Sequence, residues 1–357
     1  MSRFFSEKYK SLVPYTPGEQ PKDMKYIKLN TNESPFPPSK KAMEYAAAET
    51  GNYQLYSDPE CTELVRIAAE RFGVEKNEIL FTNGSDEILN FAFMAFCDND
   101  HPAYFPDITY GFYSVFAEIN NIPYTEIPLE SDFTINISDY EGKKGGIFIA
   151  NPNAPTGIAL TLSEVEMIIK ANPESVVVID EAYVDFGAES AVPLIKKYDN
   201  LLVTQTFSKS RSMAGARLGF GIGCKELIQD LNTIKYSTNP YNVNRATMAA
   251  GVGSLEDEDY TVENCKKIIA TRERTAKELK TLGFEMTESS ANFIFAKHTE
   301  VGGERIYLEL KKKGILVRHF TKPGLCEYNR ITVGTDEQMD ALLLAIKEII
   351  GETYENN

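Results

Sequence analysis

Short apolar runs alternate with longer segments of helical periodicity between about residues 75 and 223. Alternation of this kind is typical of an α/β fold, in which helices cover both faces of a mostly parallel sheet. Each run is short and apolar, as expected for a buried strand. We therefore expect a sheet of about seven strands, at residues 79–81, 103–105, 123–127, 146–150, 176–179, 201–203 and 219–222.

The pattern changes after Pro240. A long amphipathic helix is expected there, ending near Gly283. Strand-like runs at residues 293–295 and 330–333 precede a last helix that begins at Thr335, with Gln338 placed for a capping box. These elements predict a smaller α+β domain. We expect an N-terminal arm at residues 1–35, a large domain at 36–240 and the small domain at 241–357. The apolar faces of the two helices comprise Val262, Cys265, Ile269, Ala276 and Leu279, and Met339, Leu342, Leu343 and Ile346.

The composition narrows the classes of partner. The chain has 357 residues, of which 43% are hydrophobic, and a formal net charge of −15. Length and hydrophobic content predict a packed protein with more than one core. The acidic balance argues against nucleic acid and anionic membranes as partners, because both bind basic faces. No segment approaches the roughly 18 apolar residues of a membrane span, and no apolar stretch follows the N-terminus, so a cytoplasmic protein is predicted.

The five cysteines are scattered along the chain. They form no C-x-x-C pair and no cluster with histidine, which are the patterns expected of zinc sites and redox motifs. We therefore predict neither a disulfide framework nor a bound metal.

One lysine follows the apolar run at 201–203 and has a serine on each side, in the order Ser208-Lys209-Ser210, with Arg217 further on. A lysine that attacks a carbonyl must be desolvated or held by a partner, since an exposed ammonium is a poor nucleophile. Hydroxyl groups and an arginine close by suit a phosphate. Together they indicate a Schiff base with a phosphorylated carbonyl cofactor, of which pyridoxal phosphate is the commonest. The alternative is an exposed loop with a solvated lysine.

Asp180 ends the β-branched run at 176–179, and Tyr183 follows three residues later. Ligands of parallel α/β sheets bind at the carboxyl ends of the strands, which is where Asp180 lies. Its carboxylate would pair with a pyridinium nitrogen and keep it protonated. Tyr183 would reach the phenolic oxygen of the same ring. The alternative is an aspartate that caps the next helix.

Two further loops follow predicted strands. Residues 151–157 form a rigid loop rich in proline, in which Asn153 would donate to an anionic oxygen. Gly84 and Ser85 open an apolar-periodic segment, where free backbone amides at a helix start would hold a phosphate. A simple turn and ordinary helix capping are the respective alternatives. The glycines of 219–223 lack the spacing of a dinucleotide motif, and we predict close backbone packing there.

Taken together, Gly84-Ser85, Tyr110, Asn153, Asp180, Tyr183, Ser208-Lys209 and Arg217 resemble, in order and spacing, the pyridoxal-phosphate aminotransferases of fold type I. The resemblance covers nearly the whole chain. Residues 29–35, 56–58, 84–87, the Ser-Lys-Ser-Arg loop and 330–335 are more closely similar to the histidinol-phosphate aminotransferase family. The resemblance implies an α/β fold with a mostly parallel seven-stranded sheet between helices, and a smaller α+β domain.

The resemblance also implies roles for individual residues. Lys209 would form the Schiff base, Asp180 would bind the pyridine nitrogen, and Tyr183 would face the phenolic oxygen, so these three are the implied catalytic residues. Tyr110 would stack on the ring. Tyr56 would reach in from a neighbouring subunit, which implies a homodimer. The implied cofactor-binding set is Gly84, Ser85, Asp86, Tyr110, Asn153, Asp180, Tyr183, Thr206, Ser208, Lys209, Arg217 and Tyr56, with Gly84, Ser85, Thr206, Ser208 and Arg217 around the phosphate.

The chain departs from the family pattern at two positions. Ala154 stands where the family usually has asparagine before Pro-Thr-Gly, which leaves Asn153 or Tyr183 to bond the phenolic oxygen. Ser57 stands where the family usually has proline, after Tyr56.

The implied substrate-binding residues are Tyr15, Asn32, Arg318 and Arg330. Arg330 would bind a carboxylate through two parallel hydrogen bonds, whereas Arg318 with Tyr15 would suit a phosphate. The implied reaction converts histidinol phosphate and 2-oxoglutarate into imidazole-acetol phosphate and glutamate, in histidine biosynthesis. Alternatives are a transaminase for aromatic or other amino acids, a phosphothreonine decarboxylase, and a cofactor-binding regulatory protein without turnover. For Arg318 the alternative is a surface arginine.

Overall fold

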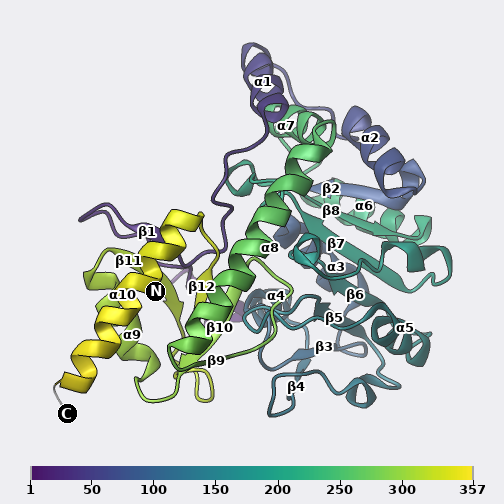
Figure 1. Cartoon of the computed structure of the whole chain (residues 1–357). Coiled ribbons are helices and arrows are strands. Elements are labelled where there is room, and N and C mark those ends of the chain that lie inside the picture. The colour runs from purple at the N-terminus through teal and green to yellow at the C-terminus, as the bar shows by residue number, and fades with distance from the viewer. Residues whose placement is uncertain (1, 356–357) are drawn as a thin grey trace.

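The larger of two sheets forms the centre of the upper and right part of the computed structural model, which describes residues 2–355 (Figure 1). It has seven strands in the order β2-β8-β7-β6-β5-β3-β4. All run parallel except β8, which is antiparallel to both its neighbours. The predicted seven strands and the mostly parallel arrangement are therefore confirmed. The strands are β2 (Ile79–Thr82), β3 (Ala103–Pro106), β4 (Tyr124–Ile127), β5 (Gly146–Ala150), β6 (Val177–Asp180), β7 (Leu201–Thr206) and β8 (Gly219–Gly223).

Helices cover both faces of this sheet because alternate strand residues point to opposite sides. Ile147, Ile149 and Val203 pack on one face with α2 (Thr62–Phe72) and α5 (Leu162–Ala171). Phe148 and Leu202 pack on the other face with α3 (Ser85–Phe96), α4 (Phe112–Asn120) and α6 (Lys225–Thr238). Strands that are buried on both sides read as continuous apolar runs, which is why the sequence pattern located them.

The smaller sheet has the order β1-β11-β12-β10-β9. Its strands are β1 (Ile27–Leu29), β9 (Phe284–Met286), β10 (Phe293–His298), β11 (Ile315–His319) and β12 (Asn329–Thr332). The N-terminal segment supplies β1, which pairs in parallel with β11. Helices α9 (Gly303–Lys312) and α10 (Asp336–Glu355) pack on it through a separate apolar core. The predicted capping box is present, since Thr335 and Gln338 exchange two hydrogen bonds at the start of α10.

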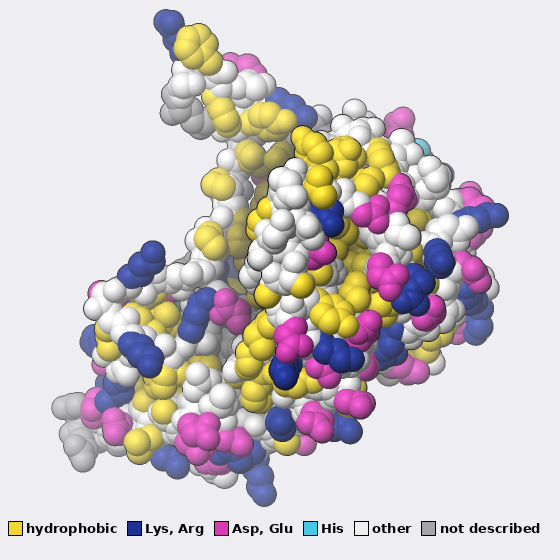
Figure 2. Space-filling view, turned by 90° about the horizontal axis from the view of Figure 1, so that it is seen from above, with side chains coloured by type: hydrophobic (Ala, Val, Ile, Leu, Met, Phe, Trp, Pro, Cys, Tyr) yellow, Lys and Arg dark blue, Asp and Glu magenta, His cyan; other side chains and the backbone are white. Residues whose placement is uncertain are grey.

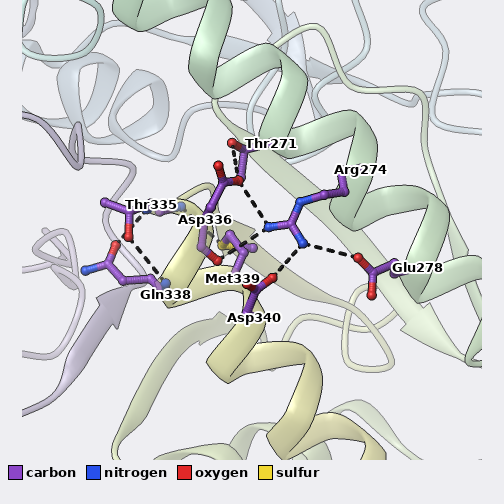
Figure 3. A network of polar contacts seen from close by, with 9 residues as sticks. Thr271, Arg274, Glu278, Thr335, Asp336, Gln338, Met339 and Asp340 are labelled. Atoms are coloured by element: carbon purple, nitrogen blue, oxygen red, sulfur yellow. Dashed lines mark hydrogen bonds and ion pairs between the residues drawn. The ribbon is translucent and has the colours of Figure 1, made fainter.

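Helix α8 (Glu258–Thr281) runs from α7 (Arg245–Leu255) beside the large sheet down to the small one (Figure 1). Its Arg274 donates to Asp336 at 3.1 Å and to Asp340 at 2.6 Å, both on α10 (Figure 3). Thr271 adds a 2.9 Å bond to the same Asp336 carboxylate. The long helix is thereby fixed to the start of α10, directly after the strand that carries Arg330.

Candidate active site

A cavity of about 340 Å³ lies where β5, β6 and β7 end. Ala150, Asp180 and Thr206, the last residues of these strands, all line it. This is the edge at which ligands of parallel sheets bind. We call it the first cavity. Its lining also includes Ser85, Asp86, Tyr110, Ala154, Tyr183, Ser208, Lys209 and Arg217.

Asp180 is only 4% exposed in the first cavity. One carboxylate oxygen accepts from the Tyr113 hydroxyl at 3.0 Å and the other from Thr204 at 3.3 Å. Burial raises the pKa of Asp180 to about 6, although these hydrogen bonds act in the opposite direction. A buried carboxylate without a cation of its own favours a cationic partner in the cavity.

Lys209 reaches the first cavity from a turn that follows β7. Its Nζ donates to the Thr31 carbonyl oxygen at 3.4 Å and lies 5.6 Å from the centre of the Tyr183 ring. Ser212, whose φ is +58°, closes the turn by donating its N–H to the Lys209 carbonyl at 3.2 Å. The amine therefore points toward the segment around Thr31 and Tyr183.

The start of α3 forms one wall of the first cavity. Gly84 precedes the helix with φ +77° and provides no side-chain cap, so the first amides of the helix remain available to an anion. A Cβ at Gly84 would lie 2.5 Å from Nη2 of Arg217, and one at Gly219 would lie 2.3 Å from the Ser85 nitrogen. Glycine at both positions thus allows the helix start, the arginine and the sheet to approach closely. The predicted close packing at Gly219 is confirmed.

A chain of polar contacts connects Arg217 to the ring of Tyr110. Nη2 of Arg217 donates to Asp86 at 2.8 Å, and the Tyr110 hydroxyl donates to the other oxygen of Asp86 at 2.6 Å. Burial, followed by the Asp86 charge, raises the pKa of Tyr110 well above its ordinary value. Thr206 donates to the Ser208 hydroxyl at 2.9 Å on the same wall. The cavity therefore presents a guanidinium, two hydroxyls and a helix start to one volume.

A second cavity, of about 520 Å³, adjoins the first. Thr31, Tyr110, Ala154, Tyr183 and Lys209 line both. The lysine thus lies between the two volumes. All four predicted substrate-binding residues, Tyr15, Asn32, Arg318 and Arg330, line the second cavity.

Arg318 and Arg330 lie directly opposite each other on β11 and β12. Arg330 donates to the Asn30 carbonyl at 3.2 Å, its Nε has no partner, and burial lowers its pKa from the ordinary value. Arg318 donates only weakly, to the carbonyls of Thr16 and Pro17 at 3.3 and 3.4 Å. Like charges on opposite strands repel, and an anion between them removes that cost. Within residues 2–355, neither arginine has a carboxylate partner.

Asn32 holds Tyr183 from the side of the N-terminal segment. Its amide donates to the Tyr183 hydroxyl at 2.9 Å, and its backbone, at φ +56°, donates to Thr332 at 2.9 Å. The Thr332 hydroxyl donates in return to the side-chain oxygen Oδ1 of Asn32 at 3.0 Å. Asn32 therefore joins β12 of the small sheet to a residue of the first cavity.

Three predicted site residues, Gly84, Asn153 and Tyr56, do not line either cavity. Gly84 still precedes the helix start that forms one wall of the first cavity. Asn153 donates to the Ile108 carbonyl at 2.9 Å and accepts from Thr109 at 2.8 Å, so its side chain is engaged within the loops. The neighbouring residue, Ala154, lines both cavities instead of Asn153. Tyr56 is 80% exposed and stacks on Tyr241 with 4.6 Å between ring centres. In this chain neither Asn153 nor Tyr56 is brought to Lys209.

The sequence pattern missed Tyr113 and Thr31. Tyr113 is fully buried and donates to Asp180, and it lies three residues after Tyr110, on the first turn of α4. The two rings meet edge to face with 5.7 Å between their centres, but Tyr110 precedes the start of α4, so no helical spacing in the sequence pointed to Tyr113. Thr31 contributes a backbone oxygen, for which a sequence carries no signal. Among the described residues there is no group of side chains that could hold a metal ion and no helix able to cross a membrane.

The family model for aminotransferase class I and II matches residues 24–346. Histidinol-phosphate aminotransferase of Brachyspira hyodysenteriae is 52% identical over 98% of this chain and 99% of its own length. That of a Marinomonas strain is 51% identical over 98% and 100%. The chain therefore belongs to the class I and II aminotransferases and, among them, to the histidinol-phosphate aminotransferase family.

Solved structures share the fold. Histidinol-phosphate aminotransferase of Sinorhizobium meliloti, determined in complex with pyridoxal 5'-phosphate, has a TM-score of 0.89 at 23% identity and covers 99% of both chains. The Clostridium acetobutylicum enzyme has a TM-score of 0.85 at 24% identity over 91% of this chain and 99% of its own. These likenesses confirm the predicted fold class.

Pyridoxal 5'-phosphate is the cofactor of this family, and three features of the first cavity fit it. The uncapped start of α3 with Arg217 suits a phosphate. The buried Asp180 suits a protonated ring nitrogen. Gly84 leaves space where a side chain would meet Arg217.

Proposed function

We propose that this chain transfers the amino group of histidinol phosphate to 2-oxoglutarate, producing imidazole-acetol phosphate and glutamate in histidine biosynthesis. The observation that carries the proposal is the pair of opposed arginines in the second cavity, Arg318 and Arg330, which have no carboxylate partner within residues 2–355. One arginine suffices for the α-carboxylate that 2-oxoglutarate and glutamate share with other transaminase substrates. The second, beside Tyr15, gives the site the charge that a phosphate requires.

For the reaction we assign roles to residues of the two cavities. The cofactor, when bound, supplies an electron sink that stabilises negative charge on the donor carbon. Arg217, Ser208, Thr206 and the first amides of α3 would hold its phosphate. Asp180 would hold the proton on the ring nitrogen, with Tyr113 and Thr204 fixing the carboxylate. Tyr110 would stack on the ring, and Tyr183, oriented by Asn32, would bind its phenolic oxygen.

Lys209 would act as the base. Its amine lies on the boundary of the two cavities and would remove the proton from the donor carbon that bears the nitrogen. Arg330 and Arg318 would orient the donor so that this carbon faces Nζ. The first cavity would thus hold the groups that take part in the reaction, and the second cavity would hold the groups that bind the substrate.

A panel of amino donors with 2-oxoglutarate tests the proposal. Histidinol phosphate should give the highest kcat/KM, and histidinol, which lacks the phosphate, should be much poorer. Phenylalanine, leucine and phosphothreonine complete the panel, with carbon dioxide release measured for the last. A higher kcat/KM for phenylalanine or leucine, or carbon dioxide from phosphothreonine, would contradict the assignment.

We also propose a homodimer. Large apolar side chains are exposed around α1 (Lys40–Glu49) and α7, among them Tyr45, Tyr53, Leu55, Tyr56 and Tyr241. Figure 2, viewed from that side, shows apolar side chains gathered between scattered charges. An exposed apolar patch of this kind marks a protein interface. Analytical ultracentrifugation tests it, and a monomer at micromolar concentration would contradict it.

The predicted division at residues 35 and 240, and a cytoplasmic location, are kept as proposals. All five cysteines are free, which suits a reducing compartment. Limited proteolysis and cell fractionation are the respective tests.

A further inference from the structure

Arg211 lies two residues after Lys209 but lines neither cavity. It is 8% exposed. Its Nη2 donates to Glu258 at 2.8 Å and its Nη1 to the Ser254 carbonyl at 3.3 Å. The guanidinium also lies 5.3 Å from the centre of the Phe207 ring. A buried arginine with this many fixed contacts holds its part of the backbone in place.

The acceptor, Glu258, is the first residue of α8. Its other carboxylate oxygen accepts from Nη2 of Arg71 at 2.7 Å. Burial opposes ionisation, but Arg211 and Arg71 hold the pKa of Glu258 below its usual value. The carboxylate therefore bridges two arginines, one of which belongs to the turn of Lys209.

Side chains of that turn attach it to two other segments. Arg211 connects it to α8, and Ser212 donates to the hydroxyl of Ser34 at 2.8 Å. Within the turn, Met213 donates its N–H to the Phe207 carbonyl at 3.0 Å. The lysine backbone is thus held between α8 and the segment that also contributes Thr31.

The same α8 contacts the substrate side of the site further along its length. Arg274 binds Asp336 and Asp340 of α10, which follows the strand of Arg330 (Figure 3). One helix of 24 residues therefore contacts both the turn of Lys209 and the element next to Arg330.

We propose that Arg211 is a positioning residue for Lys209: its ion pair with Glu258 fixes the lysine turn to α8. The inference rests on the proposed function, in which Lys209 is the reacting lysine. The ion pair keeps Nζ at the boundary of the two cavities. A displacement of about 1 Å of a reacting group costs on the order of a hundredfold in rate.

The test compares Arg211→Lys with Arg71→Lys. Each substitution keeps the positive charge and removes one of the two guanidinium groups that donate to the Glu258 carboxylate. Arg211→Lys should lower kcat about tenfold, with KM for both substrates within twofold, because binding groups are untouched. Arg71→Lys should leave kcat within twofold. Equal losses in both variants, or a wild-type kcat in Arg211→Lys, would overturn the proposal.

A second readout needs no amino donor and is independent of substrate identity. Borohydride reduction of the cofactor-loaded protein, followed by peptide mass spectrometry, measures how completely Lys209 is linked. The absorbance of the bound cofactor against pH reports the environment of that link. Arg211→Lys should shift the pH at which this absorbance change is half complete, the absorbance midpoint, and Arg71→Lys should not. A merely structural role would lower the melting temperature of both variants and leave both midpoints unchanged.

Glu258→Gln keeps the proposal testable where Arg211→Lys does not fold. It should reproduce the absorbance shift. Where Arg211→Lys does fold, the double variant should shift the midpoint little further, because both substitutions act through one contact. Additive effects would contradict the inference. If histidinol phosphate is not the donor but these spectra change as expected, the proposed substrate fails and the positioning role stands.

Discussion

The two cavities differ in how their charges are balanced. In the first, Arg217 already pairs with Asp86, and Asp180 is held by Tyr113 and Thr204. In the second, the hydrogen bonds of Arg318 and Arg330 within the described chain go to backbone carbonyls, and neither arginine has a carboxylate partner there. The polar groups at the edge of the large sheet are thus already held by other residues, as suits a cofactor that stays bound. The arginines of the small sheet have no carboxylate partner in the described chain, as suits anionic substrates that bind and leave. Chemistry and recognition are separated at Lys209, and each prediction below tests that separation.

Lys209→Ala should have the largest effect. It removes both the covalent attachment and the base, so the transamination rate should fall roughly a thousandfold or more with every donor. The absorbance of the linked cofactor should disappear as well. Lys297→Ala, on the surface beside Glu285, is the matched control and should behave as wild type. Residual activity near that of the control would place the base elsewhere.

Asp180→Asn should lower kcat roughly a hundredfold, because an amide cannot stabilise a protonated ring nitrogen. KM for 2-oxoglutarate should change little if recognition is confined to the second cavity. Steady-state kinetics with both substrates separate the two parameters. A large rise in KM with unchanged kcat would show that Asp180 contributes to substrate binding, and would contradict the separation of reaction and recognition between the two cavities.

The same variant tests the charge of the first cavity through stability. Burial raises the pKa of Asp180 to about 6 from an ordinary value of 3.8. A carboxyl whose pKa is higher in the folded state stabilises the fold below both values and loses this contribution as the pH rises through the folded pKa. Relative to Asp180→Asn, the cofactor-free wild type should lose about 2 kcal/mol of unfolding free energy between pH 4 and 7. Urea unfolding at both pH values measures it, and a pH-independent difference would contradict it.

Arg330→Met should raise KM for both substrates roughly a hundredfold, the cost of two charge-assisted hydrogen bonds of about 1.5 kcal/mol each. It also removes a buried cation that lacks a carboxylate partner, so the cofactor-free protein should not be destabilised. Kinetics and urea unfolding give the two readouts. Loss of stability together with unchanged KM would show that Arg330 is structural.

Arg318→Gln should raise KM for histidinol phosphate about tenfold and leave that for 2-oxoglutarate unchanged, since one charge-assisted bond to phosphate is lost. KM for histidinol, which has no phosphate, should be the same in Arg318→Gln and in the wild type. Equal effects on both substrates would show that the two arginines are not specialised.

The smallest effect should come from Lys322, which lines the second cavity and donates to the Asp107 carbonyl at 2.6 Å. Lys322→Ala should raise KM for anionic substrates by about two- to threefold, because the side chain is exposed and screened by salt. The difference should vanish at about 0.5 M salt. A salt-independent effect would indicate a direct contact rather than long-range attraction.

The apolar runs in the sequence predicted the strands of the large sheet and the residues at their carboxyl ends. Buried strands read as unbroken apolar runs, so Asp180 and Lys209 could be placed at strand ends without the structure. The partners across the chain could not be placed in this way. β1 pairs with β11 through residues almost 300 positions apart, and nothing in Ile27–Leu29 indicates that register.

Side-chain direction in loops was also beyond the sequence. Asn153 and Ala154 are neighbours, and only the path of the loop decides that the alanine faces both cavities. On α8, Val262 was expected on the apolar face and is 39% exposed, whereas Cys265 and Leu279 are buried as predicted. A periodic pattern defines a face only to within a turn, and packing decides its edge.

The alternating glycines of β8 have a consequence for mutational tolerance. A Cβ at Gly219 would meet the Ser85 nitrogen at 2.3 Å, and one at Gly221 would meet Ile88 at 2.3 Å. A saturation library across this strand should therefore yield almost no functional clones at Gly219, where the obstacle is backbone, and should accept only small residues at Gly221, where the buried Ile88 side chain has to shift. Attempts to widen substrate range by random mutagenesis have to leave Gly219 unchanged and concentrate diversity on the rim of the second cavity.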